Sequence, residues 1–377
     1  MNRTTLKIDN MQLLISKKQA LNHTPSPYAW PLKAPYIYAL DLTTVCNNFC
    51  SGCANASLSR EKTKRKERIE YMQDWKGLID RIADHARLIR LTGGEPTLHR
   101  EFKEIVEYIN EKQIPFTLFT TGRWTVTKPQ EIIEILKPLQ YFEGMLVSLH
   151  GSTKETHHAF VESVDGAFDE TCNNISLAAK AGLTVFTNAV ITTWNASQIK
   201  DIFKLSMRLG AKYVVYNRYL GLPHPCEPSK ETLRTTIRLI EEMKSEGFPC
   251  RFGAPIPQCF EPNTSPPTKS GYQSCNITPF GEVRPDNFIT MGLGNIFKQT
   301  IEEIWSSPLI KGYRSFVPKD CVSCAVVDSC HGGATSVLIQ HGLANDPLFV
   351  QPLSDYPLGY QPDSFENGIK YIGLSQD

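Results

Sequence analysis

The stretch Asp41-Leu-Thr-Thr-Val-Cys46-Asn-Asn-Phe-Cys50-Ser-Gly-Cys53 places three cysteines in a short loop directly after a strand-like run, Tyr36–Leu42. Three soft thiolates at this spacing can hold one iron–sulfur cube and leave its fourth iron open. Structural zinc sites usually use CxxC pairs and four protein ligands, so zinc fits this spacing less well. The stretch therefore predicts an iron–sulfur site at the end of a strand.

The composition of the chain is that of a globular protein. Its 377 residues are 41% hydrophobic and 21% charged, with a formal net charge of +1. This charge supplies no global field to attract nucleic acid, and no run approaches the ~18 apolar residues of a membrane helix. The cysteines number 11, which is odd, and residues 1–35 lack a secretory signal pattern. We therefore expect a cytoplasmic protein, without nucleic-acid or membrane partners, whose thiolates bind metal rather than form disulfides.

Strand-like and helix-like segments alternate from Tyr36 to Phe252, which is typical of an α/β protein with a parallel sheet. Six such units are too few for a closed eight-stranded barrel, so the pattern predicts a partial (β/α)6 TIM-like barrel. In such sheets ligands bind at the carboxyl ends of the strands. The expected strands are Tyr36–Leu42, Leu88–Thr92, Pro115–Thr120, Glu143–Leu149, Thr184–Thr192 and Tyr213–Asn217.

The composition of the sequence changes after a helix expected over Thr232–Gly247. Residues Pro249–Pro267 are rich in proline, which predicts an irregular segment. Cysteines and turns then surround one short helix near Ile296–Trp305, and we expect a small domain that bound metal stabilises. The expected division is an N-terminal extension (1–35), the barrel (36–252), the small C-terminal iron–sulfur domain (253–340) and a tail (341–377).

The CxxxCxxC loop resembles that of the radical SAM superfamily, which binds a [4Fe-4S] cluster there on a partial six-stranded barrel. Leu91-Thr-Gly-Gly-Glu-Pro96, after the second expected strand, resembles the GGEP motif of the same family. The resemblance implies that Gly93, Gly94 and Glu95 receive the amino group of S-adenosylmethionine. This is sensible chemistry, because glycines let the backbone approach closely and a carboxylate is a charge-matched acceptor for an ammonium group.

Polar residues at later strand ends resemble further cofactor contacts of the family. The resemblance implies that Ser148, Asn188 and Arg218 meet the ribose or the carboxylate of S-adenosylmethionine, and that the backbone near Leu220 meets the adenine. Each of the polar residues has an alternative role as an ordinary turn former or cap. Gly52 departs from the family pattern, which usually has an aromatic residue before the third cysteine to pack the adenine. This departure leaves adenine packing open, whereas cluster binding is unaffected.

A second group of cysteines, Cys321-Val-Ser-Cys324-Ala-Val-Val-Asp-Ser-Cys330, lies in the expected small domain. Thiolates that converge there can close either a tetrahedral zinc site or an iron–sulfur cube, and spacing alone does not choose. Together with Cys275 and Gly281, the run resembles the auxiliary-cluster extension called SPASM, or its shortened twitch form.

The resemblance to SPASM is incomplete. The full form holds two auxiliary clusters, but Asp286 and Ala334 stand here where the family would have cysteine ligands. The shortened pattern implies one auxiliary cluster, with Cys259 or Asp286 as alternatives to the first of its ligands. The expected ligands are Cys275, Cys321, Cys324 and Cys330.

Other cysteines and histidines carry weaker signals. Cys172 lies on an apolar helix stripe and is expected to pack as a buried thiol. Cys226 and Cys250 have no partner at ligand spacing and stay unassigned. His157 and His158 are expected to cap a helix or to lie at the surface.

The resemblance implies an enzyme that uses S-adenosylmethionine to generate a 5′-deoxyadenosyl radical, which takes a hydrogen from its substrate. A SPASM-like ending implies a maturase of a ribosomally synthesised precursor peptide, acting by crosslinking, epimerisation or backbone excision (splicing). The alternatives are a small-molecule radical SAM dehydrogenase or cyclase and, from another class, a zinc-binding scaffold. We also expect an electron donor such as flavodoxin or ferredoxin. A separate leader-peptide-binding protein is expected too, because about 35 residues before the first strand are too few for a domain.

Overall fold

The computed structural model describes residues 32–53, 55, 71–162, 166–220, 223–262 and 270–355. Most of the predicted N-terminal extension and the end of the predicted tail therefore lie outside the described residues. Within the described residues, no helix is both long and apolar enough to cross a bilayer.

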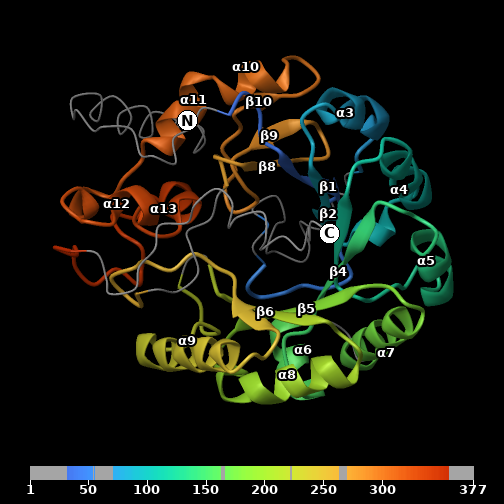
Figure 1. Ribbon diagram of the computed structural model, residues 1–377, viewed down its shortest axis with the longest axis horizontal. Helices are drawn as coiled ribbons and strands as arrows, with labels where there is room; N and C mark the ends of the chain where they lie inside the picture. The colour runs from blue at the N-terminus through green and yellow to red at the C-terminus, as the bar shows by residue number, and fades with distance from the viewer. Residues whose placement is uncertain are drawn as a thin grey trace.

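One sheet of ten strands organises the chain, in the order β10-β9-β8-β1-β2-β3-β4-β5-β6-β7. Neighbours from β1 to β7 pair in parallel, β8 is parallel to β1, and β9 and β10 run antiparallel at one edge. The sheet curves, with its helices on the outside (Figure 1), and its two edges do not pair. This is the open, partial barrel that the sequence predicts. The strands are β1 (Ile37–Thr43), β2 (Leu88–Gly93), β3 (Phe116–Thr120), β4 (Phe142–Ser148), β5 (Val185–Ile191), β6 (Tyr213–Arg218), β7 (Cys250–Phe252), β8 (Ser274–Ile277), β9 (Glu282–Arg284) and β10 (Gly294–Asn295).

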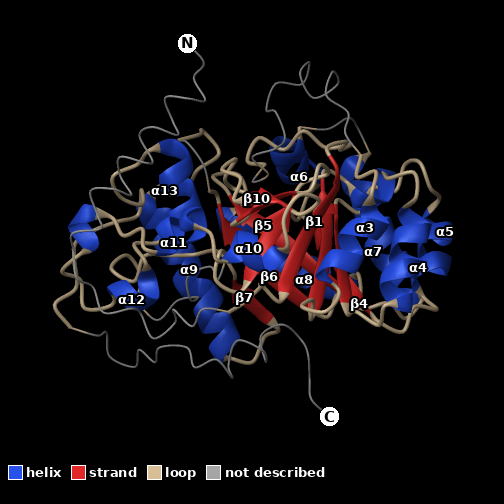
Figure 2. Cartoon of the chain, turned by 90° about the horizontal axis from the view of Figure 1, so that it is seen from above, coloured by secondary structure: helices blue, strands red, loops and turns tan. Residues whose placement is uncertain are grey.

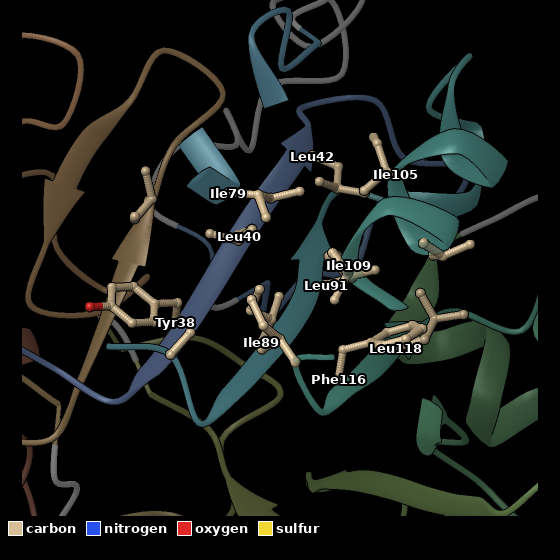
Figure 3. Packing of buried hydrophobic residues seen from close by; sticks show 14 of the residues in the cluster. Tyr38, Leu40, Leu42, Ile79, Ile89, Leu91, Ile105, Ile109, Phe116 and Leu118 are labelled. Atoms are coloured by element: carbon tan, nitrogen blue, oxygen red, sulfur yellow. The ribbon is translucent and has the colours of Figure 1, made fainter. Parts of the chain in front are cut away.

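Amphipathic helices connect the parallel strands. In α4 the buried residues are Phe102, Ile105, Val106 and Ile109, which is the spacing of one helical face. Figure 3 shows how this face and that of α3 pack against side chains of β1, β2 and β3. The barrel helices are α3 (Trp75–Ile82), α4 (Phe102–Glu111), α5 (Pro129–Leu136), α6 (Lys154–Val161), α7 (Ala167–Lys180), α8 (Ile199–Arg208) and α9 (Lys230–Ser245), with 3-10 turns η1 (Pro96–Leu98) and η2 (Ala196–Gln198).

The C-terminal region contributes to the same core as the barrel. Ile304 and Trp305 belong to the apolar cluster that also contains β1, β2 and β3, and Val337 belongs to a second cluster built on β6, β7 and α9. The sheet also continues across the predicted boundary at residue 252, because β8 pairs with β1. The short helix expected near Ile296–Trp305 is present as α10. The C-terminal helices are α10 (Ile301–Trp305), α11 (Pro308–Arg314), η3 (Lys319–Cys321), α12 (Val327–Cys330) and α13 (Thr335–His341), placed beside the sheet in Figure 2.

The prediction of an irregular segment from Pro249 is wrong at its start, where residues 250–252 form β7. Cys250 and Phe252 are fully buried, and Cys250 pairs with Val214 of β6. A strand of this length shows too little alternation to be recognised beside prolines.

Candidate functional site

The cysteine loop, residues 44–53, leaves the carboxyl end of β1 and lies across the end of α6. The amides of Phe49 and Ser51 donate to the carbonyls of Val161 (2.9 Å) and Phe160 (3.0 Å). These bonds fix the backbone of the loop. All three of its cysteines are half-buried and form no disulfide: Cys46, Cys50 and Cys53.

The glycine turn after β2 lies directly against this loop. The amides of Gly94 and Glu95 donate to the carbonyls of Thr43 and Val45, both at 2.7 Å. A Cβ atom on Gly94 would stand 2.0 Å from the carbonyl oxygen of Val45 and 3.1 Å from the Cβ atom of Cys46. A side chain cannot be accommodated at such distances, so glycine is required for the two strand-end loops to meet.

Glu95 is fully buried and ties the ends of β2 and β3 together. One carboxylate oxygen accepts from the hydroxyls of Thr97 (2.7 Å) and Thr120 (2.8 Å), and the other accepts from the amide of Thr121 (2.6 Å). Burial raises the pKa of Glu95, although these hydrogen bonds oppose the shift. The side chain thus serves as an internal acceptor that holds neighbouring strand ends in register.

The remaining predicted cofactor contacts differ in whether their side chains are half-buried at the strand ends or buried within the protein. Ser148 and Asn188 pair across the ends of β4 and β5 and are both half-buried, and the side-chain oxygen of Asn188 accepts from Asn217 (2.5 Å). Arg218, in contrast, forms a buried two-pronged ion pair with Asp346 (2.9 and 2.5 Å). Leu220 is buried in the second apolar cluster.

Gly52, where the family usually has an aromatic residue, has aromatic neighbours from elsewhere in the chain. A Cβ atom on Gly52 would lie 2.7 Å from the ring of Phe160 and 2.9 Å from the ring of Tyr219. Both rings are buried. Phe160 of α6 and Tyr219 after β6 therefore occupy the space beside the third cysteine.

Arg123 is a functional candidate that the sequence analysis missed. Its guanidinium donates to the carbonyl of Asn47 (3.0 Å) and to the side chain of Asn48 (3.1 Å), and its Nε donates to Glu170 (2.7 Å). Asn47 in turn donates to the carbonyl of Arg123 (2.7 Å). Arg123 thus clamps the loop between the first two cysteines. Its position after Thr120-Thr-Gly122 at a strand end was the available signal.

His157 is fully buried, so the expectation that it lies at the surface is wrong. Its Nδ1 accepts from the amide of His150 (3.2 Å), and burial lowers the pKa of His157 to about 3. His158 does act as a cap, because its Nε2 accepts from the amide of Phe168 in the first turn of α7 (3.2 Å).

A second site lies in the C-terminal region, around one small cavity. The residues that line it come from three segments, 257–259, 321–332 and 349–351, and include Cys259, Cys321, Cys324 and Cys330. Burial, and then the nearby Cys330, Cys324 and Cys259, raise the pKa of Cys321 to about 12. Four of the chain's thiols therefore meet at this cavity.

Cys275 lies elsewhere. It is on β8, paired with Tyr38 of β1, is 2% exposed, and belongs to the main apolar cluster of the sheet. The carboxylate of Asp286 is also buried, and accepts from Ser336 Oγ (2.6 Å) and from the amide of Phe288 (2.8 Å). Three of the four expected auxiliary ligands, Cys321, Cys324 and Cys330, therefore lie together at the cavity. Cys275 does not line it, and Cys259 lies beside the three instead.

The donor chemistry of both sites suits iron–sulfur clusters. Sulfur atoms around one tetrahedral zinc ion lie about 3.8 Å apart, since each Zn–S bond is about 2.3 Å. Within the described residues, no group of three or more His, Cys, Asp or Glu side chains is arranged to hold a single metal ion. An iron–sulfur cube takes thiolate ligands, which is the kind of side chain that both sites offer.

Comparisons with known proteins agree with this geometry. The radical SAM superfamily model matches residues 40–206, and the SPASM model, described as an iron–sulfur cluster-binding domain, matches residues 269–331. The chain is 27% identical over 341 residues to the antilisterial bacteriocin subtilosin biosynthesis protein AlbA of Bacillus subtilis, covering 86% of this chain and 71% of AlbA. It is also 27% identical over 300 residues to the AdoMet-dependent heme synthase of Methanosarcina barkeri, covering 73% and 83%.

The fold is similar to that of Streptococcus suis SuiB, solved with bound S-adenosylmethionine. The TM-score is 0.68 at 17% identity, and the match covers 92% of this chain and 88% of SuiB. SuiB has also been solved bound to its precursor peptide SuiA.

Proposed function

Because this chain belongs to the radical SAM superfamily and carries a SPASM domain, we propose that it is an enzyme that modifies a ribosomally synthesised precursor peptide. The observation that carries the proposal is the loop of three half-buried cysteines at the carboxyl end of β1, held against the glycine turn after β2. Open α/β sheets bind their ligands at this edge.

Cys46, Cys50 and Cys53 would hold the [4Fe-4S] cluster of the family. When bound, cluster and S-adenosylmethionine supply the one-electron cleavage that yields a 5′-deoxyadenosyl radical able to take a hydrogen from the substrate. The protein's own residues orient the cofactor and keep water away from the reacting atoms.

The cofactor-binding residues divide into contacting and positioning residues. The backbone of Gly93 and Gly94, which lies beside the cysteine loop, would receive the amino group of S-adenosylmethionine. Ser148 and Asn188, neighbours on β4 and β5, would meet its ribose or carboxylate, and the backbone at Leu220 would meet its adenine. Glu95 and Arg218 act as positioning residues, because their charged groups are engaged within the protein: Glu95 with Thr97, Thr120 and Thr121, and Arg218 with Asp346.

The peptide substrate is supported by the relatives. AlbA is named for the biosynthesis of a bacteriocin, and SuiB is solved with a precursor peptide. The similarity to AdoMet-dependent heme synthases, at 24–27% identity and over 73–85% of this chain, favours a second candidate, a small-molecule substrate. The outcome of the reaction is proposed as crosslinking, epimerisation or backbone excision at the peptide core.

Two protein partners and a compartment complete the proposal. An electron donor such as flavodoxin or ferredoxin would reduce the first cluster. A separate protein would bind the leader part of the precursor. Cysteines that form no disulfide suit a cytoplasmic protein.

The experiment is incubation of the anaerobically reconstituted protein with S-adenosylmethionine, a reductant and candidate precursor peptides taken from short reading frames beside its gene. Mass spectrometry distinguishes the outcomes, because crosslinking removes a pair of hydrogens, excision removes a fragment, and epimerisation in deuterated water exchanges a hydrogen for deuterium. An unmodified peptide, together with turnover of a porphyrin precursor, would favour the small-molecule alternative.

A further inference from the structure

We propose that Cys259, Cys321, Cys324 and Cys330 are the four ligands of a single auxiliary iron–sulfur cluster, and that Cys275 is not a ligand. The inference rests on the proposed function, because it names the protein ligands of the cluster that a SPASM domain binds. It differs from the assignment that the resemblance to SPASM implies, in which Cys275 is the first ligand.

The first argument is convergence. The four thiols line the same small cavity, although Cys259 is far from the other three along the chain. Cys259 follows the barrel, on the segment after β7, whereas the others surround η3 and α12. Val326, Val327 and Phe349 contribute apolar side chains to the wall of the cavity, and Pro257, Gly332 and Gln351 complete it. The apolar part of this wall limits the access of water to a cluster.

The second argument is a set of backbone amides that donate to the sulfur atoms. The amide of Gln258 donates to Cys330 Sγ (3.4 Å), that of Val350 to Cys259 Sγ (3.5 Å), and that of Leu353 to Cys324 Sγ (3.4 Å). Amide donors stabilise sulfur as thiolate, and hydrogen bonds to cluster sulfurs are one of the levers by which a protein sets the cluster's reduction potential. Neutral thiols buried only for packing would gain little from three amide donors, whereas thiolate ligands are stabilised by them.

The third argument concerns the competing candidates. Cys275 is packed in the sheet core against β1, with a different set of neighbours. The Asp286 carboxylate is engaged by Ser336 and by the amide of Phe288. Neither residue lines the cavity.

A functional consequence follows from the ligand count. A cube with four thiolate ligands has a protein ligand on every iron, so no iron is open for a substrate atom. The auxiliary cluster of this protein is therefore closed to direct substrate binding, unlike one with three protein ligands.

The test uses the full chain in a background where the first cluster cannot form, Cys46→Ala/Cys50→Ala/Cys53→Ala. After anaerobic purification, iron and acid-labile sulfide are measured per chain, and the reduced protein is examined by electron paramagnetic resonance. The background should retain about four irons, as in one cube. Adding Cys275→Val should leave iron, sulfide and spectrum unchanged.

Adding Cys259→Ala to the background should lower iron to about two per chain or fewer. Because that variant could lose iron through misfolding, Cys259→Ser is measured beside it. An oxygen ligand should keep part of the iron and change the resonance spectrum, which a structural role would not do. The proposal is overturned if Cys259→Ala keeps the full iron content and spectrum, if folded Cys275→Val loses the cluster, or if the site holds zinc.

The experiment distinguishes failure of the auxiliary ligand assignment from failure of the proposed function. If the wild type holds about four irons and the triple variant none, the auxiliary assignment fails while radical SAM chemistry at the first site stands. If the wild type holds no iron after anaerobic reconstitution, both fail.

Discussion

The contact between Gly94 and the cysteine loop depends on the absence of one methyl group. A Cβ atom there would overlap the Val45 carbonyl at 2.0 Å, so Gly94→Ala must push the loop from the turn. We expect it to cost about 1–3 kcal/mol of stability, as overpacking does, and to remove iron from the first site. Iron per chain and thermal midpoints measure both effects.

Gly77→Ala is the control for this substitution. Gly77 lies in α3, where a methyl group would meet the carboxylate of Asp74, which caps the helix by accepting from the Gly77 amide (3.0 Å), rather than backbone. The gain in helix propensity, about 1 kcal/mol, should offset this contact. Full iron content in Gly94→Ala would contradict the role given to the glycine turn.

Asp286 offers a second residue-level prediction. Burial raises the pKa of Asp286 to about 6 from its ordinary 3.8. The contribution of Asp286 to the free energy of unfolding is therefore fully present below about pH 4, where the carboxyl is neutral in both states, and is lost as the pH rises through 6. Asp286→Asn should therefore stabilise the protein at pH 7.5 by up to about 3 kcal/mol. This advantage should shrink as the pH falls toward 4.

Urea unfolding at several pH values, with exposed Asp84→Asn as control, measures the effect. Iron content should be unchanged in Asp286→Asn, because Asp286 lies outside the proposed ligand set. Loss of iron in this variant would instead support Asp286 as a ligand.

At the scale of elements, the Arg218–Asp346 pair joins the end of β6 to the segment that follows α13. The pair is buried, with side chains 4% and 0% exposed. Asp346 also accepts from the amides of Ala334 and Leu348. Burial alone would raise the pKa of Asp346, but the charge of Arg218 and these hydrogen bonds lower it. The segment that supplies the amides of Val350 and Leu353 to the second site is thereby fixed on the barrel.

Arg218→Met should cost about 3–5 kcal/mol, because it leaves the Asp346 carboxylate buried without its partner. It should also lower the auxiliary iron content, since the amide donors move with the segment. Arg238→Met is the matched control, because the Arg238 side chain is 65% exposed and its partner Glu261 keeps a second ion pair, with Arg234; it should therefore cost much less stability than Arg218→Met. Equal effects of the two substitutions, measured by thermal unfolding, would contradict the role of the Arg218 pair.

Sequence periodicity predicts best the strands that are long enough for buried and half-buried side chains to alternate several times. The strand from Val185 to Ile191 alternates between buried and half-buried side chains along its whole length, and its expected range is right to within one residue at each end. β7 has no such length, so it was missed. His157 was misplaced for a related reason, because the packing that buries it comes from neighbours outside its own helix.

At the scale of the whole molecule, the first cysteine group could be recognised because its three cysteines are local in sequence. The second could not be predicted completely, since Cys259 and Cys275 lie at comparable distances upstream of Cys321 and only folding brings one of them to the cavity. The same holds for Asp346, whose partner Arg218 is 128 residues away. Long-range pairing of this kind leaves no periodic trace in the chain.

The chain also has spare cysteines that the proposed chemistry does not use. Cys172 packs partly buried against the main core, as expected, and burial raises its pKa to about 12. Cys172→Ala should leave the iron content of both sites and the turnover of S-adenosylmethionine unchanged, which makes it a control for every cysteine substitution described above. A loss of iron in this variant, measured anaerobically, would require a different partition of the thiols.

Radical SAM chemistry at the β1 loop can be tested most directly by measuring 5′-deoxyadenosine formed from S-adenosylmethionine by the anaerobically reconstituted, reduced protein. We predict its formation by the wild type and by Cys172→Ala. Cys50→Ala should form none above background while it retains the auxiliary iron. Iron-loaded wild-type protein that forms no 5′-deoxyadenosine, or undiminished formation by Cys50→Ala, would contradict the assignment.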